Sequence, residues 1–325
     1  MMPLLRADLH VHTCHSKITG TMRFLGSRDC YSQPADVYRV AKARGMDLVA
    51  FTDHDSIDGA LELLNDRPDG RDVDVIVGEE VSCRFPDADI EVHLAVYGMT
   101  ESLHRDLQPL RSNVFDVAAR LRDAGVVFAL NHLLHFYRGQ IPLERYLRIL
   151  DEVPALEARN GAMLPGQNRL IERLAQQMPA IASSTGRFGV VGGSDAHTLR
   201  RVGTTWTEAP GRDRDEFMSS VRSGLGRPGG RDGGALAVSG DAYGVIGCYI
   251  AGLAGIARPD HSGWRRAACL AFAVGSLPFQ LLPFALVSKG KLRERRKVRA
   301  LERWMTASLG GDGSAPWART VEAQR

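Results

Sequence analysis

Two histidines and an aspartate alternate with apolar residues near the start of the chain, in Asp8-Leu9-His10-Val11-His12. In a β-strand the side chains alternate between two faces, so Asp8, His10 and His12 would share one face. Imidazole is the commonest protein ligand of metals, and two such rings on one strand can bind the same ion beside a carboxylate that orients them. The pattern indicates a metal site, although a surface strand with incidental histidines fits this short motif equally well.

Further histidines and acidic residues occur where other apolar, β-branched segments end. They lie in Thr52-Asp53-His54-Asp55, Gly78-Glu79-Glu80, Val92-His93-Leu94, Asn131-His132 and Gly193-Ser194-Asp195-Ala196-His197. The carboxyl ends of strands form the active-site face of α/β barrels, with each strand contributing a residue or two. Five strand ends that carry such residues are hard to explain by chance. The set as a whole therefore favours a metal-dependent enzyme.

The elements that would position these residues alternate between short strands and amphipathic helices as far as about Thr207. Such alternation is typical of parallel strands joined by crossover helices. Strands are predicted over residues 5–12, 47–52, 74–82, 91–97, 126–130, 155–159 and 188–192. Helices are predicted over residues 34–44, 56–64, 102–124, 143–150 and 167–178. Seven strand–helix units predict a closed or nearly closed α/β barrel.

In this order the motifs resemble those of the polymerase and histidinol phosphatase (PHP) family, over residues 5 to about 207. The resemblance implies a distorted (β/α)7, TIM-like barrel that holds two or three divalent metal ions and hydrolyses phosphate esters. It implies one ion bound by His10, His12, Glu79 and Asp195, a second that shares Glu79 and adds His93 and His132, and a third bound by His54 and His197. Nitrogen and oxygen ligands suit zinc, manganese and iron alike.

The third ion lacks a ligand in this resemblance. Many PHP sequences read His-Thr-x-x-Ser-Asp-Gly after the first strand, whereas this chain reads His12-Thr13-Cys14-His15-Ser16-Lys17. A protonated lysine has no lone pair to offer a metal. His15 from the same loop, or Asp29 from the segment after it, could replace the aspartate, and the sequence leaves both open.

The expected reaction is hydrolysis of a phosphate ester by metal-activated water. A pair of metals neutralises the anionic oxygens and lowers the pKa of a bridging water toward ~7. Cationic side chains near the barrel mouth would bind the remaining oxygens, and Arg159 is the first candidate, followed by Lys17 and Arg200. The predicted catalytic residues are Asp195, His197 and Arg159. A small phosphomonoester or a nucleotide is the expected substrate.

Composition narrows the class of protein. With 325 residues, 44% hydrophobic and 24% charged, the chain suits a large globular domain with an appendage, and a net charge of +3 gives no sign of a nucleic-acid binder. The five cysteines are scattered and contain no Cys-x-x-Cys pair, which favours a reducing compartment over a disulfide framework. The first residues contain no apolar stretch of signal-peptide length, so we expect a cytoplasmic protein.

The chain changes character after residue 223. The glycine-dense residues 224–235 are typical of a linker between a barrel domain (1–223) and an apolar, basic helical extension (236–325). Residues 267–287 are about as long as a membrane span and precede a basic cluster at 289–299, which favours attachment to the inner face of a membrane through residues 241–299. The alternative is a pair of helices packed on the barrel or on a second subunit, because Pro278 and Pro283 would break a straight helix.

Two functions fit these observations. The first is a cytoplasmic, metal-dependent phosphoesterase. The second is a catalytically silent metal-binding module that recruits partners, with its tail at a membrane. The complete set of predicted ligands favours the enzyme, because a silent module would have no need to keep it.

Overall fold

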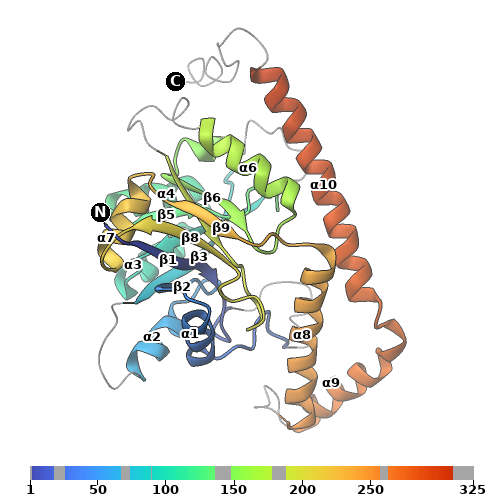
Figure 1. The fold of residues 1–325 in the computed structure, drawn as a ribbon. Helices are drawn as coiled ribbons and strands as arrows, with labels where there is room; N and C mark the ends of the chain where they lie inside the picture. The colour runs from blue at the N-terminus through green and yellow to red at the C-terminus, as the bar shows by residue number, and fades with distance from the viewer. Residues whose placement is uncertain are drawn as a thin grey trace.

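The computed structural model describes residues 2–17, 26–66, 74–88, 90–135, 148–177, 188–256 and 263–309. One sheet carries the fold, in the strand order β7-β6-β5-β4-β3-β2-β1-β8-β9 (Figure 1). Its strands are β1 (Leu4–Val11), β2 (Leu48–Phe51), β3 (Val75–Arg84), β4 (Glu91–Tyr97), β5 (Val127–Leu130), β6 (Ala155–Asn160), β7 (Gly189–Gly193), β8 (Thr205–Pro210) and β9 (Arg227–Gly230). The first seven match the seven predicted strands within two residues at each end.

The sheet curls until the end of β7 lies against β1. The backbone N–H of Asp195 donates to the carbonyl of His10 at 2.8 Å, and that of His12 donates to Ala196 at 3.1 Å. Gly193 allows this approach, because a Cβ at that position would collide with the Cβ and the backbone nitrogen of His10. The predicted nearly closed barrel is therefore confirmed. Strands β8 and β9 extend the sheet beyond β1 as antiparallel neighbours.

Strand β4 runs antiparallel to both of its neighbours, β3 and β5, so the prediction of parallel strands throughout is wrong here. The physical reason is the short connection between Arg84 and Glu91, since a short loop can join antiparallel strands whereas parallel strands need a crossover of a dozen or more residues. The reversal has a consequence for the site. His93, near the start of β4, lies at the same edge of the sheet as the carboxyl ends of the parallel strands, and it is paired in register with Ser82 of β3.

The helices around the barrel are α1 (Pro34–Ala43), α2 (Asp58–Asn65), α3 (Glu101–Leu107), α4 (Val114–Asp123), α6 (Pro165–Gln177) and α7 (Arg214–Arg222). The single helix predicted over 102–124 is two helices separated by a 3-10 turn, Gln108–Leu110. Pro109 has no N–H to continue α3, and the side chain of Asn113 caps α4 by accepting a hydrogen bond from Phe115 N at 3.1 Å. The helix predicted over 143–150 lies mostly outside the described residues.

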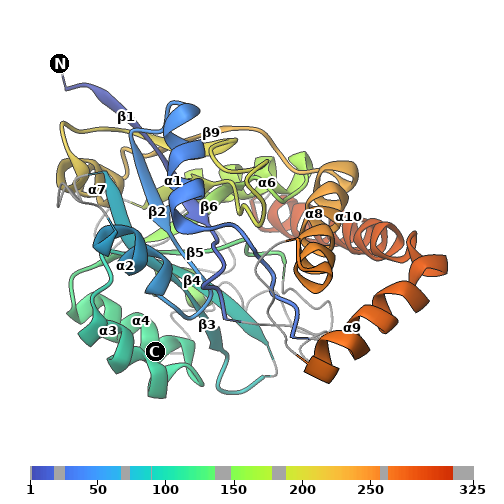
Figure 2. The same ribbon diagram turned by 90° about the horizontal axis from the view of Figure 1, so that it is seen from below.

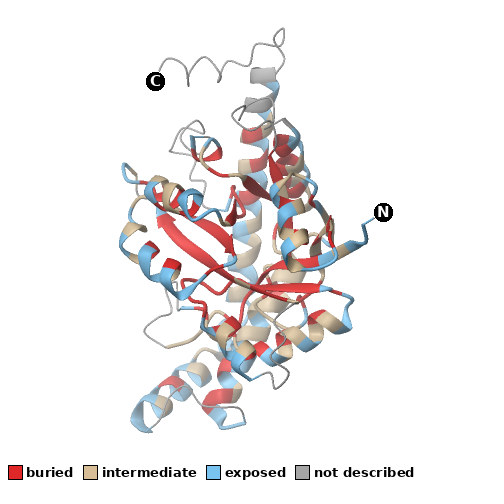
Figure 3. Ribbon diagram, turned by 90° about the vertical axis from the view of Figure 1, so that its left-hand side faces the viewer, coloured by how far each residue is buried: buried red, intermediate tan, exposed pale blue. Residues whose placement is uncertain are grey.

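Buried apolar side chains join the sheet to its helices, and Figure 3 shows the burial concentrated along the strands. One cluster connects Leu94 and Leu130 of the sheet with Leu121 of α4 and Leu174 of α6. The same cluster includes Leu301, which is 1% exposed and belongs to the long C-terminal helix. The C-terminal region therefore shares the core of the barrel.

The described part of the C-terminal extension contains three α-helices, α8 (Ala235–Ala254), α9 (Gly263–Gly275) and α10 (Leu282–Leu309). A hydrogen bond from Thr198 Oγ1 to Asp241 at 2.9 Å ties α8 to the barrel. The backbone N–H of Leu164 donates to Glu294 at 2.8 Å and ties α10. Part of the predicted linker, residues 227–230, is instead strand β9, paired with β8. The division into domains at residues 223 and 236 stays a prediction.

The apolar run 267–287 is not one straight helix. It comprises α9, a 3-10 turn at Leu277–Phe279 and the start of α10, so these residues do not form one continuous helix, and membrane association stays a prediction. Pro278 lies within the turn and Pro283 in the first turn of α10, where a proline is tolerated while the preceding helix must end. Among the described helices, α8 is the one that length and composition would allow to cross a membrane.

Candidate metal centre

Eight side chains with metal-ligating chemistry converge at one edge of the barrel. They form four overlapping groups, in each of which the ligand atoms lie within 4.8 Å of one another. The groups are His10, His12 and Asp195; His10, Glu80 and His132; His54, Glu80 and His93; and His12, His54 and His197. Seven of the eight residues predicted from the sequence to bind metal are present in this set. The eighth member of the set, Glu80, was not predicted.

Six different segments bring these side chains together. His10 and His12 come from the end of β1, and His93 comes from the reversed strand β4. His132 and Asp195 follow β5 and β7 with φ of 26° and 50°. Residues other than glycine rarely adopt this left-handed conformation, which costs energy and occurs preferentially at functional sites. The strained backbone thus coincides with two of the proposed ligands.

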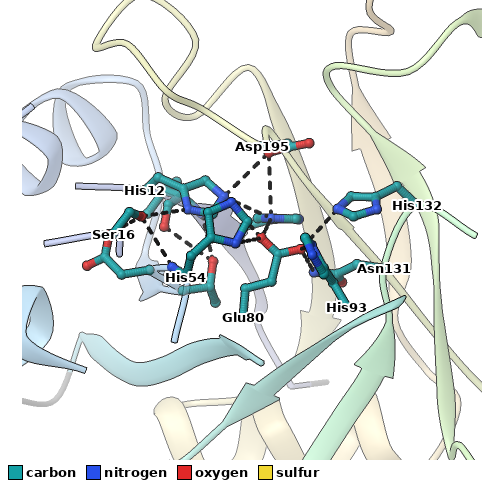
Figure 4. A network of polar contacts seen from close by, with 12 residues as sticks. His12, Ser16, His54, Glu80, His93, Asn131, His132 and Asp195 are labelled. Atoms are coloured by element: carbon teal, nitrogen blue, oxygen red, sulfur yellow. Dashed lines mark hydrogen bonds and ion pairs between the residues drawn. The ribbon is translucent and has the colours of Figure 1, made fainter. Parts of the chain in front are cut away.

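Glu80 lies at the centre of the group, between two sets of histidines (Figure 4). Its Oε2 is 3.1 Å from Nε2 of His10 and 3.4 Å from Nε2 of His12. Its Oε1 is 2.9 Å from Nε2 of His132 and 3.0 Å from Nδ1 of His93. A carboxylate in this position can bridge two ions, one oxygen to each.

The prediction that Glu79 is this bridging ligand is wrong. Its carboxylate lies on the other side of β3, where Oε2 is 2.7 Å from Nδ1 of His104. Side chains alternate along a strand, so only one of two adjacent glutamates can face the histidines. The sequence Glu79-Glu80 does not show which of the two glutamates faces the histidines.

Neighbouring polar groups fix the orientation of the rings and carboxylates. Nδ1 of His10 lies 2.8 Å from Glu157 Oε1, and because a carboxylate only accepts, Nδ1 donates and Nε2 keeps its lone pair for the centre. Asn160 Nδ2 donates to Asp195 Oδ2 at 3.1 Å and to Glu157 Oε2 at 2.9 Å. Sequence analysis missed Glu157 and Asn160. The available signal was a lone acidic residue inside the apolar strand β6.

The charges of the group are strongly coupled. Burial opposes ionisation of Glu80, yet the surrounding histidines, His10 foremost, hold the pKa of Glu80 well below its usual range. Burial likewise opposes ionisation of Asp195, and His10 holds its pKa well below the usual value. Burial would lower the pKa of His93, but the Glu80 carboxylate raises it to about 9. The buried carboxylates therefore require positive charge beside them.

The donor set fits divalent cations. Nε2 of His10 and Nε2 of His12 lie only 3.1 Å apart and face the same two carboxylates. Converging imidazole nitrogens and carboxylate oxygens, with a second layer of hydrogen bonds that orients them, are the usual composition of zinc, manganese and iron sites. A cation among them would supply the positive charge that protonated histidines otherwise provide.

A third cluster of donors lies at the more open side of the site. His197 stacks on His12, with ring centroids 4.3 Å apart, and its side chain is 27% exposed. Asp29 Oδ2 lies 3.5 Å from His54 Nε2, and both Asp29 oxygens are buried without a hydrogen-bond partner among the described residues. His15, the other residue suggested by the sequence, lies 2.8 Å from Glu62 instead. The structure thus brings Asp29 to this cluster.

The three basic side chains that we expected to bind phosphate at the barrel mouth differ in their contacts. Arg159 forms an ion pair with Glu172 at 2.7 Å and donates to Gly230 O at 3.2 Å, so the prediction that it binds phosphate is not supported by its contacts. Arg200 donates to Ala237 O in α8. Lys17 is exposed and lies beside His54, because its backbone N–H donates to His54 O at 3.0 Å.

Comparison with known proteins identifies similar sequences and folds. A family model described as PHP-associated matches residues 165–225. Uncharacterized protein MJ1587 of Methanocaldococcus jannaschii is 37% identical over 78 residues, which are 24% of this chain and 44% of that protein. The chain therefore matches less than half the length of this relative.

Several solved structures share the fold. PsfC from Pseudomonas syringae PB-5123 has a TM-score of 0.50 and 18% identity, covering 76% of this chain and 100% of its own. A two-domain protein from Bacteroides vulgatus that contains a predicted PHP-like metal-dependent phosphoesterase has a TM-score of 0.44 and 16% identity, over 71% of this chain and 66% of its own. The lesion-specific endonuclease PfuEndoQ from Pyrococcus furiosus has a TM-score of 0.45 and 17% identity, over 70% and 57%. At 18% identity the likeness to PsfC concerns the fold alone.

Proposed function

We propose that this chain is a metal-dependent hydrolase of phosphate esters, since its motifs resemble those of the PHP family and a PHP-associated family model matches residues 165–225. One observation carries the proposal, which is the convergence of six histidines with Glu80 and Asp195 at one edge of the barrel. Among the related structures, the names of the Bacteroides protein and the Pyrococcus endonuclease refer to phosphoester chemistry.

The proposed ligands divide into three positions. His10, His12 and Asp195 would hold one ion, and His93 and His132 a second, with the two oxygens of Glu80 between the two positions. Zinc, manganese and iron all suit these ligands. Bound divalent ions would neutralise the anionic phosphoryl oxygens and bring the pKa of water close to ~7.

We propose that Asp29 completes a third position with His54 and His197. Its two oxygens are buried and have no hydrogen-bond partner among the described residues, with His54 Nε2 3.5 Å from Oδ2, and a buried carboxylate that accepts no hydrogen bond is costly. A cation at this place would remove that cost. Asp29 would thus replace the aspartate that the PHP resemblance predicts at Lys17, from a segment further along the chain.

The remaining residues would bind and position the substrate. Lys17 is exposed beside His54, so its ammonium group can reach a phosphate held at the third position. Asn160 holds the Asp195 carboxylate at 3.1 Å and Glu157 holds the His10 ring, which keeps both ligands fixed while substrate binds. A small phosphomonoester or a nucleotide is the proposed substrate, in keeping with Lys17 as the exposed lysine beside His54 among the described residues.

The proposed compartment is the cytoplasm. All five cysteines lie among the described residues and none forms a disulfide, and Cys30, Cys83 and Cys269 are buried. Buried thiols of this kind are compatible with a reducing environment.

The direct test is to purify the full chain, measure its bound metals, and assay phosphomonoesters, dinucleotides and short RNAs with and without added Mn²⁺. We expect bound divalent metal, hydrolysis of at least one phosphomonoester or nucleotide, and loss of that activity in a chelator. A protein that binds no divalent metal, or a metal-loaded protein that hydrolyses none of these compounds, would contradict the proposal.

A further inference from the structure

Helix α9 and the turn into α10 project from the barrel (Figures 1 and 2). Large apolar side chains along these segments are exposed, and we call them the apolar corner; they are Trp264, Phe272, Val274, Phe279, Leu281 and Leu286. Trp264 is 83% exposed, Leu281 79% and Phe279 65%. Soluble proteins rarely expose so many large apolar side chains together unless they contact a membrane or a partner.

A basic segment of α10 follows the apolar corner along the chain. Residues 289–303 of α10 contain eight Lys or Arg and two Glu. Lys289, Arg293 and Arg296 are exposed, whereas Glu294 is buried against the barrel and binds Lys291 at 2.6 Å. The exposed charges of this segment are therefore mostly positive. Apolar side chains next to exposed lysine and arginine match the interface of a membrane with anionic lipids.

We propose that the apolar corner inserts into the interface of an anionic lipid bilayer, with the exposed basic residues of α10 on the lipid headgroups. A charged partner surface on a protein would satisfy the basic residues but would leave Phe279 and Leu281 in water. A second copy of the chain would bury the apolar residues but would bring two basic segments together. The lipid interface satisfies both features at once.

The lengths and contacts of α8 and α9 favour insertion into the membrane interface over a helix that crosses the membrane. Helix α9 has 13 residues, about 20 Å at 1.5 Å per residue, against roughly 30 Å of hydrocarbon. Helix α8 has 20 residues and is long enough, but its Asp241 accepts from Thr198 and pairs with Arg201 at 3.4 Å. Farther along α8, Tyr249 and Leu253 are buried with Cys269 of α9. A span through α8 would break these contacts, whereas insertion of the corner keeps them.

Vesicle flotation of the purified full chain tests the proposal without any assay of activity. The vesicles are phosphatidylcholine alone or phosphatidylcholine with phosphatidylglycerol. We expect the protein to float with the anionic vesicles, to float poorly with the neutral ones, and to be released by alkaline carbonate. The double variant Phe279→Glu/Leu281→Glu should lose at least about tenfold in vesicle binding.

A matched control is Leu225→Glu, since Leu225 is 49% exposed on the barrel, far along the chain from the corner. It should float like the parent protein, and both variants should keep the parent's metal content and circular dichroism. The proposal is overturned if the parent protein does not bind anionic vesicles, or if Leu225→Glu loses as much binding as the double variant. Resistance to carbonate would show a span instead, and a dimer in solution that the double variant dissociates, without flotation, would show a second copy.

Discussion

The carboxylates of Glu79 and Glu80 lie on opposite sides of β3, although the two residues are adjacent in sequence. Glu80 contacts five histidines of the proposed metal centre, while Glu79 contacts only His104, at 2.7 Å, among the histidines of the described chain. The phase of one strand thus decides which glutamate can bind metal. Substitution of each residue separates the two roles.

Glu80→Gln should abolish metal retention at the shared position. The substitution removes a carboxylate that balances His10 and His93, and replacement of even an orienting residue at a metal site commonly costs ~10–100-fold in affinity. We expect a loss at least that large, measured by metal analysis after dialysis. Glu79→Gln is the control and should retain its metal. Equal metal contents in the two variants would contradict the central role of Glu80.

Asp29→Asn should remove one ion and leave the others. The amide keeps the size of the side chain but loses the charge that the third position requires, so the metal-to-protein ratio should fall by about one while binding at Glu80 persists. Asp36→Asn is a suitable control, because Asp36 is an acidic residue on α1 that pairs with Arg39 at 2.9 Å. An unchanged ratio in Asp29→Asn would show that Asp29 is not a ligand.

Tyr31→Ala should weaken binding of the ion at the third position indirectly. Tyr31 lies two residues after Asp29 and packs against the cluster of Tyr249, Leu253 and Cys269. Loss of that contact frees the segment that positions Asp29, so more metal should be needed to fill the third position while the first two fill as before. Metal titration followed by thermal shift measures this, and identical titration curves for both proteins would refute the coupling.

The metal-free protein should lose stability as the pH rises through the slightly alkaline range. Despite the opposing effect of burial, Glu80 raises the pKa of His93 to about 9, against about 6.5 in the unfolded chain. A raised folded-state pKa contributes stability that is complete below about 6.5 and is lost as the pH approaches 9. Melting temperatures of chelated protein should fall across this window, and bound metal, which replaces the protons, should flatten the dependence. A flat profile without metal would contradict the assignment.

Gly193→Ala should destabilise the barrel where its two ends meet. The added methyl group would collide with His10, and overpacking of this kind typically costs about 1–3 kcal/mol. Chemical unfolding of the metal-free protein measures the loss. Gly247→Ala is the matched control, because a Cβ there meets nothing within 4 Å, and it should be neutral or slightly stabilising. An equal response of the two variants would argue against a tight β1–β7 contact.

The sequence predicted the strands and most of the site because both follow from local patterns. Alternation placed His10 and His12 on one face of β1, and apolar runs placed His54, His132 and Asp195 after strands. The antiparallel direction of β4 follows from the short loop between Arg84 and Glu91, which the pattern of strands and helices does not indicate. Which of Glu79 and Glu80 faces the histidines depends on the alternation of side chains along β3, which the sequence does not reveal. Arg159 was misjudged because its partner, Glu172, comes from a helix whose packing the sequence does not reveal.

The long-range contacts were predicted only in part. Glu157, which orients His10 across 147 positions of sequence, was not predicted, whereas Asp29 was one of two candidates, with His15, for the position beside His54. Each contact joins residues that no periodicity connects. Lys17 stands where the PHP resemblance predicts an aspartate, so the sequence showed that a ligand was missing. Only the structure shows that Asp29 lies beside His54.

The most direct test of the proposed function is a metal titration in which occupancy and hydrolysis are followed on the same samples. Protein stripped with a chelator is supplied with increasing Mn²⁺, and bound metal and release of phosphate from a phosphomonoester or nucleotide are measured at each step. The account predicts that the stripped protein is inactive, that hydrolysis rises with occupancy, and that Glu80→Gln gains neither. Hydrolysis by the stripped protein, or full occupancy without hydrolysis of any phosphate ester, would contradict it.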